Sequence, residues 1–466
     1  MTSVKQRSRD FTEGPLFVRM LIFTLPIMLT GLLQIFYNTA DNIVVGRFSG
    51  DDLALAAVGC TTGLSALVTN FLFGIGGGGS IIVAQMYGAK NYEGVKRAVH
   101  TIVTFSMIGG IIFCALGLIV SRPALALMGT KPELMENAVL YLRIICLGIP
   151  ATSVYNFGAG VVRATGDSKT SLRILSFSGL LNVGLNLIFV IVFKMSVAGV
   201  AIATISSQYV SAIRILIYLL RKRNECYGIR LSQLGIDSQM LLSIFRYGIP
   251  SGVNASMFSL SAVFISSAVN TLPTAAVSAR TIGNNIDQMC HTTIASFSST
   301  ALTVVGQNYG AKKPERIRNS ILYMLIQVAV SGILIGQTLL LFADKLSMLF
   351  VDSANPEADQ IIGYAVQILS LTLATSFLNG MWQMLGGAVR GMGYSVSCMI
   401  ISLFGACFFR LFWITFIFPL EHMNTITGLY TMFPISWVLT GIMLGITAFY
   451  AYRKLLKAGS QSVSEQ

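Results

Sequence analysis

Long apolar segments recur along the whole chain and are separated by short polar stretches. Each is long enough for a helix to cross a hydrocarbon core, which takes about 20 residues. The segments cover approximately 16–45, 53–80, 94–120, 134–158, 169–193, 196–220, 240–270, 276–304, 317–343, 359–386, 395–418 and 425–452. None alternates in the way that strands of a membrane barrel do. The pattern predicts an all-α membrane protein with 12 transmembrane helices.

Composition supports a membrane protein rather than a water-soluble one. Of 466 residues, 54% are hydrophobic and 11% are charged. A soluble fold of this size has too little interior to bury that much apolar surface. The net charge of +13 comes from short basic clusters between the apolar segments, such as Arg221-Lys222-Arg223, and not from one patch. We therefore expect a lipid bilayer as the partner and no nucleic acid.

The distribution of Lys and Arg predicts the orientation, because cytoplasmic loops carry an excess of both. With the N-terminus inside, 24 of the 32 Lys and Arg residues lie on the cytoplasmic side, beginning with Lys5, Arg7 and Arg9. The others, predicted to lie outside, are Arg47, Arg122, Lys131, Arg143, Lys194, Arg280, Lys345 and Arg410. We expect a multi-pass protein of the cell (inner) membrane, without a cleaved signal and with both termini in the cytoplasm.

The two halves of the chain repeat each other. The matching pairs, in the same order in each half, are Pro26 with Pro250, AQMYGAKNYEGVKRAV at 84–99 with GQNYGAKKPERIRNSI at 306–321, ATSVYN at 151–156 with ATSFLN at 374–379, and VVRATG at 161–166 with AVRGMG at 388–393. Six of sixteen positions are identical in the longest pair, where chance gives about one. The matches indicate that the two halves of the chain are copies of one unit.

The repeat predicts the domain organisation. Residues 1–220 form an N-terminal lobe, 221–239 a basic cytoplasmic linker, and 240–466 a C-terminal lobe. Because six helices per lobe is an even number, the lobes are parallel repeats, related by an axis along the membrane normal. We expect two pseudo-symmetric six-helix lobes around a central cavity, an arrangement that transporters use to hold substrate.

Motifs of catalysis are missing from the sequence. The histidines are scattered, and the seven cysteines form no CxxC pair. GIGGGGS at 74–80 lacks the lysine of a phosphate loop and indicates close helix packing or a flexible break. We expect neither an enzyme nor a bound cofactor.

Asp41 is the main candidate for chemistry. Gln34, Asn38 and Asp41 recur at helical spacing and form one polar stripe on the first apolar segment. An ionisable group inside a membrane usually faces an internal cavity, where it can carry a proton or bind a cation. The alternative is an acid at a helix end, in headgroup water.

Two further polar groups have both a functional and a structural interpretation. Asn182 and Asn186 on the fifth segment, with Thr204 on the sixth, could complete a pocket with Asp41 or form interhelical hydrogen bonds. Asp287 and His291 are one helical turn apart in the C-terminal half. They could be a second titrating site or a structural pair that satisfies itself.

These residues resemble the multidrug and toxic compound extrusion (MATE) family of transporters, prokaryotic type. The resemblance rests on Pro26 with YNTADN at 37–42, AQMYGAK and GQNYGAK, RATGD at 163–167, and Asn182 with Asn186. It covers nearly the whole chain. It implies a cation-coupled antiporter, driven by H⁺ or Na⁺, that exports cationic or amphipathic drugs and toxins by alternating access.

The resemblance also implies roles for individual residues. Asp41 looks like the family's proton-binding or sodium-binding aspartate, with Asn182 and Thr204 beside it. Asn186 departs from the aspartate that prokaryotic relatives often carry, which weakens a sodium site because hard cations favour anionic oxygens. The C-lobe acids of some relatives are not found at the matching positions, and Asn379 stands where one of them is expected. Apart from possible Na⁺ at Asp41, no metal is expected. The helix would bend at Pro26 during transport, and the protein would act as a monomer.

Two other functions stay open at this point. A flippase of lipid-linked oligosaccharide or lipid II, from the same superfamily, would need a cationic cavity, whereas the basic residues here concentrate at cytoplasmic ends. A passive channel or a non-transporting receptor is the second alternative, and the doubled chain and the intramembrane carboxylate favour alternating access over an open pore. Reconstitution into liposomes with an imposed ion gradient distinguishes an antiporter from a channel, because only an antiporter uses the gradient to concentrate substrate.

Overall fold

The computed structural model describes residues 10–48, 54–351 and 356–464, and these residues form helices and no strand. The basic leader with Lys5, Arg7 and Arg9 and the side chain of Arg47 lie outside the described part of the chain. The all-α prediction is confirmed.

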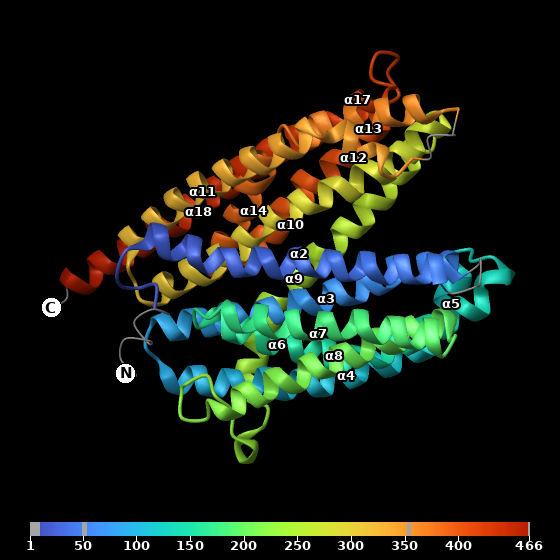
Figure 1. The fold of residues 1–466 in the computed structure, drawn as a ribbon. Helices are drawn as coiled ribbons and strands as arrows, with labels where there is room; N and C mark the ends of the chain where they lie inside the picture. The colour runs from blue at the N-terminus through green and yellow to red at the C-terminus, as the bar shows by residue number, and fades with distance from the viewer. Residues whose placement is uncertain (1–9, 49–53, 352–355, 465–466) are drawn as a thin grey trace. The chain divides into compact units, whose positions relative to one another are not determined.

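Each half of the chain contributes a series of long helices (Figure 1). The first half contains α2 (Leu16–Phe48), α3 (Ala54–Gly88), α4 (Tyr92–Leu127), α5 (Pro132–Leu147), α6 (Ile149–Ala164), α7 (Lys169–Leu187), the π-helix η1 (Ile188–Val192) and α8 (Ser196–Arg221). The second half contains the 3-10 helix η2 (Leu231–Gln233), α9 (Ser238–Val269), α10 (Thr274–Gly310), α11 (Pro314–Leu341), α12 (Ala343–Met348), α13 (Ala358–Thr372), α14 (Ser376–Gly391), α15 (Ser395–Ser402), the π-helix η3 (Leu403–Phe408), α16 (Phe409–Phe412), the π-helix η4 (Trp413–Ile417), α17 (Ile426–Tyr430) and α18 (Met432–Ser464).

These helices account for all the predicted membrane spans. Within the described ranges, 9 segments are long and apolar enough to cross a bilayer, and two bent helix pairs bring the number to 11. The remaining predicted span, 276–304, corresponds to α10, which has 37 residues but many Ser, Thr and Asn side chains. α10 is long enough to cross the bilayer, and its polar side chains must face the interior of the protein rather than lipid.

Two predicted spans are broken helices rather than single ones. The span 134–158 is α5 and α6, bent by 43°, and 359–386 is α13 and α14, bent by 47°. The second break includes Ala374 and Thr375 of the repeated Ala-Thr-Ser, and the first, at Gly148, lies just before that motif. In the first half Pro150 contributes, because it has no backbone N–H to continue α5.

The duplication is visible in the backbone of the repeated turns. Lys90 and Lys312, which end the two Tyr-Gly-Ala-Lys motifs, have φ of 57° and 53°, in the left-handed region that side chains rarely adopt. The turn hydrogen bonds also correspond: Lys90 N donates to Tyr87 O and Lys312 N donates to Tyr309 O, both at 3.1 Å. Two segments with the same unusual turn are expected of copies of one unit.

The compact units of the fold do not begin and end at the lobe boundaries drawn from the repeat. Unit 1 is essentially Leu29–Ser256, and unit 2 combines Phe11–Met28 with Met257–Gln466. The first part of α2 therefore packs within unit 2, where Met20 and Phe23 join its core. The first part of α9 packs within unit 1, where Ile244 is buried. Lobe boundaries at 1–220, 221–239 and 240–466 describe the repeat and stay a prediction.

Glycines bring α3 and α9 into backbone contact inside unit 1. A Cβ built on Gly74 would lie 2.6 Å from the carbonyl carbon of Ser251, and one on Gly78 would lie 2.5 Å from the carbonyl oxygen of Ile244. Because backbone atoms cannot move aside, neither position has room for a side chain. The structure thus agrees with the packing interpretation of the glycine-rich segment.

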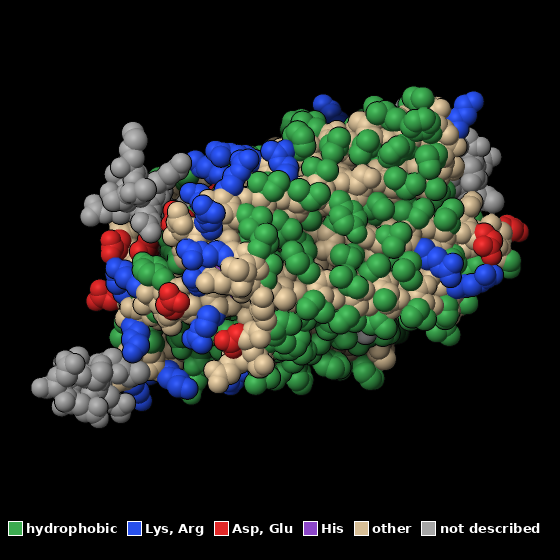
Figure 2. Space-filling view, turned by 90° about the horizontal axis from the view of Figure 1, so that it is seen from below, with side chains coloured by type: hydrophobic (Ala, Val, Ile, Leu, Met, Phe, Trp, Pro, Cys, Tyr) green, Lys and Arg blue, Asp and Glu red, His purple; other side chains and the backbone are tan. Residues whose placement is uncertain are grey.

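The surface has the pattern of a protein embedded in lipid. On the face shown in Figure 2, hydrophobic side chains form a broad band, and Lys and Arg side chains gather toward its ends. Exposed residues include Ile111, Ile119 and Leu180, at 61%, 73% and 71%. Large apolar side chains at this exposure need a hydrocarbon environment.

Candidate functional site

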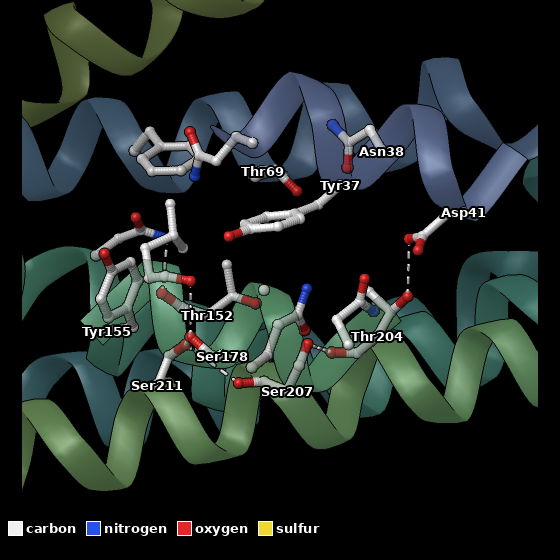
Figure 3. Close-up of a pocket in the computed structure, with 17 residues that line it drawn as sticks. Tyr37, Asn38, Asp41, Thr69, Thr152, Tyr155, Ser178, Thr204, Ser207 and Ser211 are labelled. Carbon is white, nitrogen blue, oxygen red and sulfur yellow. Dashed lines mark hydrogen bonds between the residues drawn. The ribbon is translucent and has the colours of Figure 1, made fainter. Parts of the chain in front are cut away.

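A cavity of about 350 Å³ lies inside unit 1, lined by α2, α3, α6, α7 and α8 (Figure 3). Its lining includes three of the predicted residues of the first helix, Gln34, Asn38 and Asp41. Asn182 and Thr204 line it as well, and Asn186 contacts Asp41 from α7. The structure therefore brings together six residues that were singled out in the sequence, whereas Pro26 is buried in the part of α2 that belongs to unit 2.

Asp41 is held from two helices. Asn186 Nδ2 donates to Asp41 Oδ1, and Thr204 Oγ1 lies 3.3 Å from Asp41 Oδ2. Figure 3 shows the carboxylate of α2 pointing toward Thr204 on α8. The side chain is half-buried and bonded to both neighbouring helices, which favours the cavity interpretation over an acid in headgroup water, and its role stays a prediction.

The hydroxyl of Thr204 has one proton and two possible acceptors. It lies 2.9 Å from Val200 O and 3.3 Å from the Asp41 carboxylate. A protonated Asp41 could itself donate to Thr204 Oγ1 while Thr204 keeps its bond to Val200. The pair can therefore accommodate both protonation states of the carboxyl group without moving a helix.

Asn186 leaves one acceptor unused. Its Nδ2 donates to Asp41 and lies 3.5 Å from Asn182 Oδ1, while its buried Oδ1 has no hydrogen-bond partner among the described residues. A buried amide oxygen without a partner is costly. Because Nδ2 and not Oδ1 faces Asp41, the amide would have to turn over to offer this oxygen to a cation beside the carboxylate.

Asp41 dominates the electrostatics of this cavity. The other lining residues are apolar, aromatic or neutral polar side chains, and none of those described is Lys, Arg or Glu. Tyr37, Phe73 and Tyr155 contribute aromatic rings to the walls. A cavity with one carboxylate and aromatic walls attracts organic cations.

Sequence reasoning missed a second row of polar residues. Ser178 on α7 accepts from Ser211 on α8 at 2.6 Å, and Ser207 lies between Thr204 and Ser211. The signal was available: Ser178 precedes Asn182 by one turn, and the α8 hydroxyls recur at helical spacing. Tyr37 was also missed, and Gly179 admits its ring against α7, since any Cβ there would overlap it.

A second, smaller cavity of about 140 Å³ lies inside unit 2 and contains Asp287 and His291. No hydrogen bond joins these two side chains within the described residues, so they do not satisfy each other. Asn379 lines the same cavity, where its Oδ1 accepts from Trp382 Nε1 at 3.0 Å. Whether Asp287 and His291 titrate during transport stays a prediction.

Arg410 corrects an expectation. We expected it outside the membrane, but it lies on α16 inside the span Ser395–Ile417, is 7% exposed and lines the unit 2 cavity. Counting Lys and Arg by side assumes that every base sits in a loop. An arginine flanked by FF and LF, without other charges nearby, is the sequence signal for a buried one.

Comparisons with known proteins follow the same two halves. The MatE family matches residues 26–188 and 250–414. Probable multidrug resistance protein YoeA of Bacillus subtilis is 28% identical over 392 residues, 83% of each chain. Multidrug export protein MepA of Staphylococcus aureus is 24% identical over 403 residues, 84% of this chain and 85% of its own.

Solved structures share the fold. A multidrug resistance MATE family transporter of the MOP superfamily, in an outward-facing conformation, superimposes with a TM-score of 0.87 at 23% identity, covering 96% of this chain and 98% of its own. A MOP superfamily transporter from Pyrococcus furiosus gives 0.84 at 22% identity, covering 96% and 97%. Because the family match spans both halves, the chain belongs to the MATE family of multi-pass membrane transporters.

Proposed function

We propose that this protein is a cation-coupled antiporter that exports organic cationic or amphipathic compounds from the cell by alternating access. Relatives named as multidrug export and multidrug resistance proteins support this substrate class. In this proposal the chain acts as a monomer in the cell membrane, with both termini in the cytoplasm, and Asp41 is the coupling group.

The observation that carries the proposal is that Asp41 is the one formally charged side chain in the described lining of a cavity large enough for part of a drug. An organic cation and a coupling ion both need this charge. When one binds, the other loses its counter-charge, and in a low-dielectric site that loss is large. Competition for a single site is the simplest basis for antiport.

The hydrogen bonds favour the proton as the coupling ion. Both Asp41 oxygens already face donors, Asn186 Nδ2 and Thr204 Oγ1, and Asn186 directs its amide oxygen elsewhere. A sodium ion would need that amide turned over and has only one carboxylate to neutralise it. A proton needs neither change.

A change in the bonds of Asp41 would be transmitted along α2, the helix that carries it. Asp41 and Pro26 lie on the same helix, and Pro26 removes one backbone hydrogen bond from it. A helix weakened at that point can bend when the bonds of Asp41 to α7 and α8 change.

A flippase of pyrophosphate-linked lipids is the second candidate. It would place basic side chains in its binding site to neutralise the phosphates. The described lining of the unit 1 cavity contains no Lys or Arg, which favours cations as guests.

Transport by the purified protein in liposomes tests the proposal. We expect an imposed proton gradient to drive tetraphenylphosphonium against its concentration gradient, and Asp41→Asn to abolish this uptake. Asp237→Asn is the matched control, because Asp237 is a partly exposed acid outside the unit 1 cavity that caps α9, and Asn caps equally well. Gradient-driven uptake that survives Asp41→Asn would refute the assignment, and uptake driven by sodium alone would refute the proton.

A further inference from the structure

The unit 2 cavity contains opposite charges that do not neutralise each other. Asp287, His291 and Arg410 line it together, yet no ion pair within 4.0 Å joins Arg410 to an acid among the described residues. A charged group in a bilayer core is retained only when it has a partner or a function.

Arg410 has donors to spare. Its Nε and Nη2 both point at a single hydroxyl, Ser436 Oγ, at 3.3 Å, and its guanidinium lies 4.5 Å from the centre of the Phe433 ring. A guanidinium has five N–H donors and matches a carboxylate with two parallel bonds. Its side chain is also 93% removed from solvent, so an incoming anion would meet little competition from water.

The backbone around Arg410 is irregular in the manner of a binding site. The short helix α16 that carries it is preceded by η3 and followed by η4, both π-helices. Such π-segments are rare and occur often at functional sites. In unit 1, η1 begins two residues after Asn186, and aligning Arg163 with Arg390 places Asn182 opposite Phe409, beside Arg410. The repeat has thus put a polar group on the corresponding helix of each half.

Asp287 supplies the complementary charge. It lies on α10, half-buried, and lines the cavity beside Thr372, with no ion-pair partner within 4.0 Å among the described residues. The Oδ1 of Asn379 is occupied by Trp382 Nε1 and by Gln383 Nε2, at 3.0 and 2.9 Å, so only its amide N–H groups can serve a guest. The cavity therefore offers an acceptor on one helix and donors on others.

We propose that this cavity binds a small aromatic compound that carries both a carboxylate and an ammonium group. Arg410 pairs with the carboxylate, Asp287 pairs with the ammonium, and rings of Phe258, Trp382 and Trp437 enclose the aromatic part. At about 140 Å³ the cavity is smaller than typical drug sites of about 300–1,000 Å³, which suits one substituted ring. The site is separate from Asp41 and does not depend on coupling there.

Calorimetric titration of the full-length protein in lipid nanodiscs tests this. The ligands are 4-(aminomethyl)benzoate, which has both charges, and benzoate and benzylamine, which have one each. We expect at least tenfold tighter binding of the doubly charged ligand than of either control. Arg410→Gln should reduce its affinity to that of benzylamine, and Asp287→Asn to that of benzoate.

Asp41→Asn distinguishes this site from the one in unit 1, because it should abolish coupled transport and leave this binding intact. Equal affinity for the three ligands, or an advantage that survives both Arg410→Gln and Asp287→Asn, would overturn the proposal. So would loss of binding in Asp41→Asn. If Arg410→Gln does not fold, Asp287→Asn still gives an independent answer.

Discussion

At the scale of single residues, Thr204 provides a test of the coupling proposed for Asp41. Thr204→Val keeps the shape of the side chain and removes the hydroxyl that faces Asp41 at 3.3 Å. Since a hydrogen bond to a charged group contributes about 1.5–3 kcal/mol, we expect the affinity for the coupling ion to change by about tenfold or more. Thr204→Ser keeps the hydroxyl and should transport nearly normally.

Initial rates of dye uptake into liposomes over a range of imposed gradients measure this difference. If Thr204→Val and Thr204→Ser behaved alike, the hydroxyl would have no part in coupling.

Sequence reasoning identified a cavity residue where a single unusual side chain marked it. It failed where several ordinary side chains line the cavity together or where the partners lie on another helix. Asp41 stood out because acids are rare in apolar segments. The serines of α7 and α8 did not, since a lone Ser in a membrane helix usually bonds to its own backbone. Arg410 was misplaced because its partners, Phe433 and Ser436, are on another helix and cannot be read from neighbouring positions.

At the scale of helices, the contact between α3 and α9 gives a sharp test of packing. Gly74→Ala and Gly78→Ala would each push a methyl group into backbone atoms of α9. We expect a loss of about 1–3 kcal/mol for each, as for other overpacked sites. Gly77→Ala is the control, because a Cβ there meets nothing within 4 Å.

The measurement is the thermal stability of each variant in detergent, determined from the fraction of protein that stays monodisperse on size-exclusion chromatography after heating. Equal stability of the variants at 74, 77 and 78 would show that this contact does not hold unit 1 together.

The linker is docked on α4 rather than free. Arg230 N donates to His100 Nε2 at 3.1 Å, and Asp237 N donates to Thr101 Oγ1 at 3.1 Å. Tyr227 and Ile229, at 3% and 1% exposure, join the core of unit 1. The sequence marked this stretch as basic and polar, and it could not show which of its residues turn inward.

Cys226 reports on that docking, because it is in the linker while the other six cysteines lie in membrane helices. Burial raises the pKa of Cys226 to about 11. The thiolate is the reactive form, so alkylation by maleimide should be slow at neutral pH and accelerate steadily as pH rises toward 11.

We expect His100→Ala to speed this alkylation several-fold by releasing the linker. Arg97→Ala should have a smaller effect, because the Arg97–Asp237 ion pair is partly exposed to solvent on the Arg97 side and contributes little. Fast labelling of the unaltered protein at pH 7 would contradict the docked linker.

At the scale of the whole molecule, the helix count and the family were predictable from the sequence. The apolar runs and the repeated Tyr-Gly-Ala-Lys turns gave 12 spans in two copies, which the family match supports. What could not be predicted was how the units are composed. Phe11–Met28 belongs to unit 2 because Phe11 N donates to Gln307 Oε1 and Thr24 bonds to Thr300, contacts between residues almost 300 positions apart.

Topology is the whole-molecule prediction. An even number of spans and the Lys and Arg bias require both termini in the cytoplasm. Green fluorescent protein fused to the C-terminus should therefore fluoresce, and alkaline phosphatase fused there should be inactive. The reverse pattern would contradict the orientation.

The central claim is that a proton and an organic cation compete for Asp41, and proton release on ligand binding measures this directly. Purified protein in weakly buffered detergent, with a pH-sensitive dye, is mixed with tetraphenylphosphonium. We predict that binding releases protons from the unaltered protein and that Asp41→Asn binds without release. Binding that leaves the pH unchanged in the unaltered protein, or equal release in both proteins, would contradict the account.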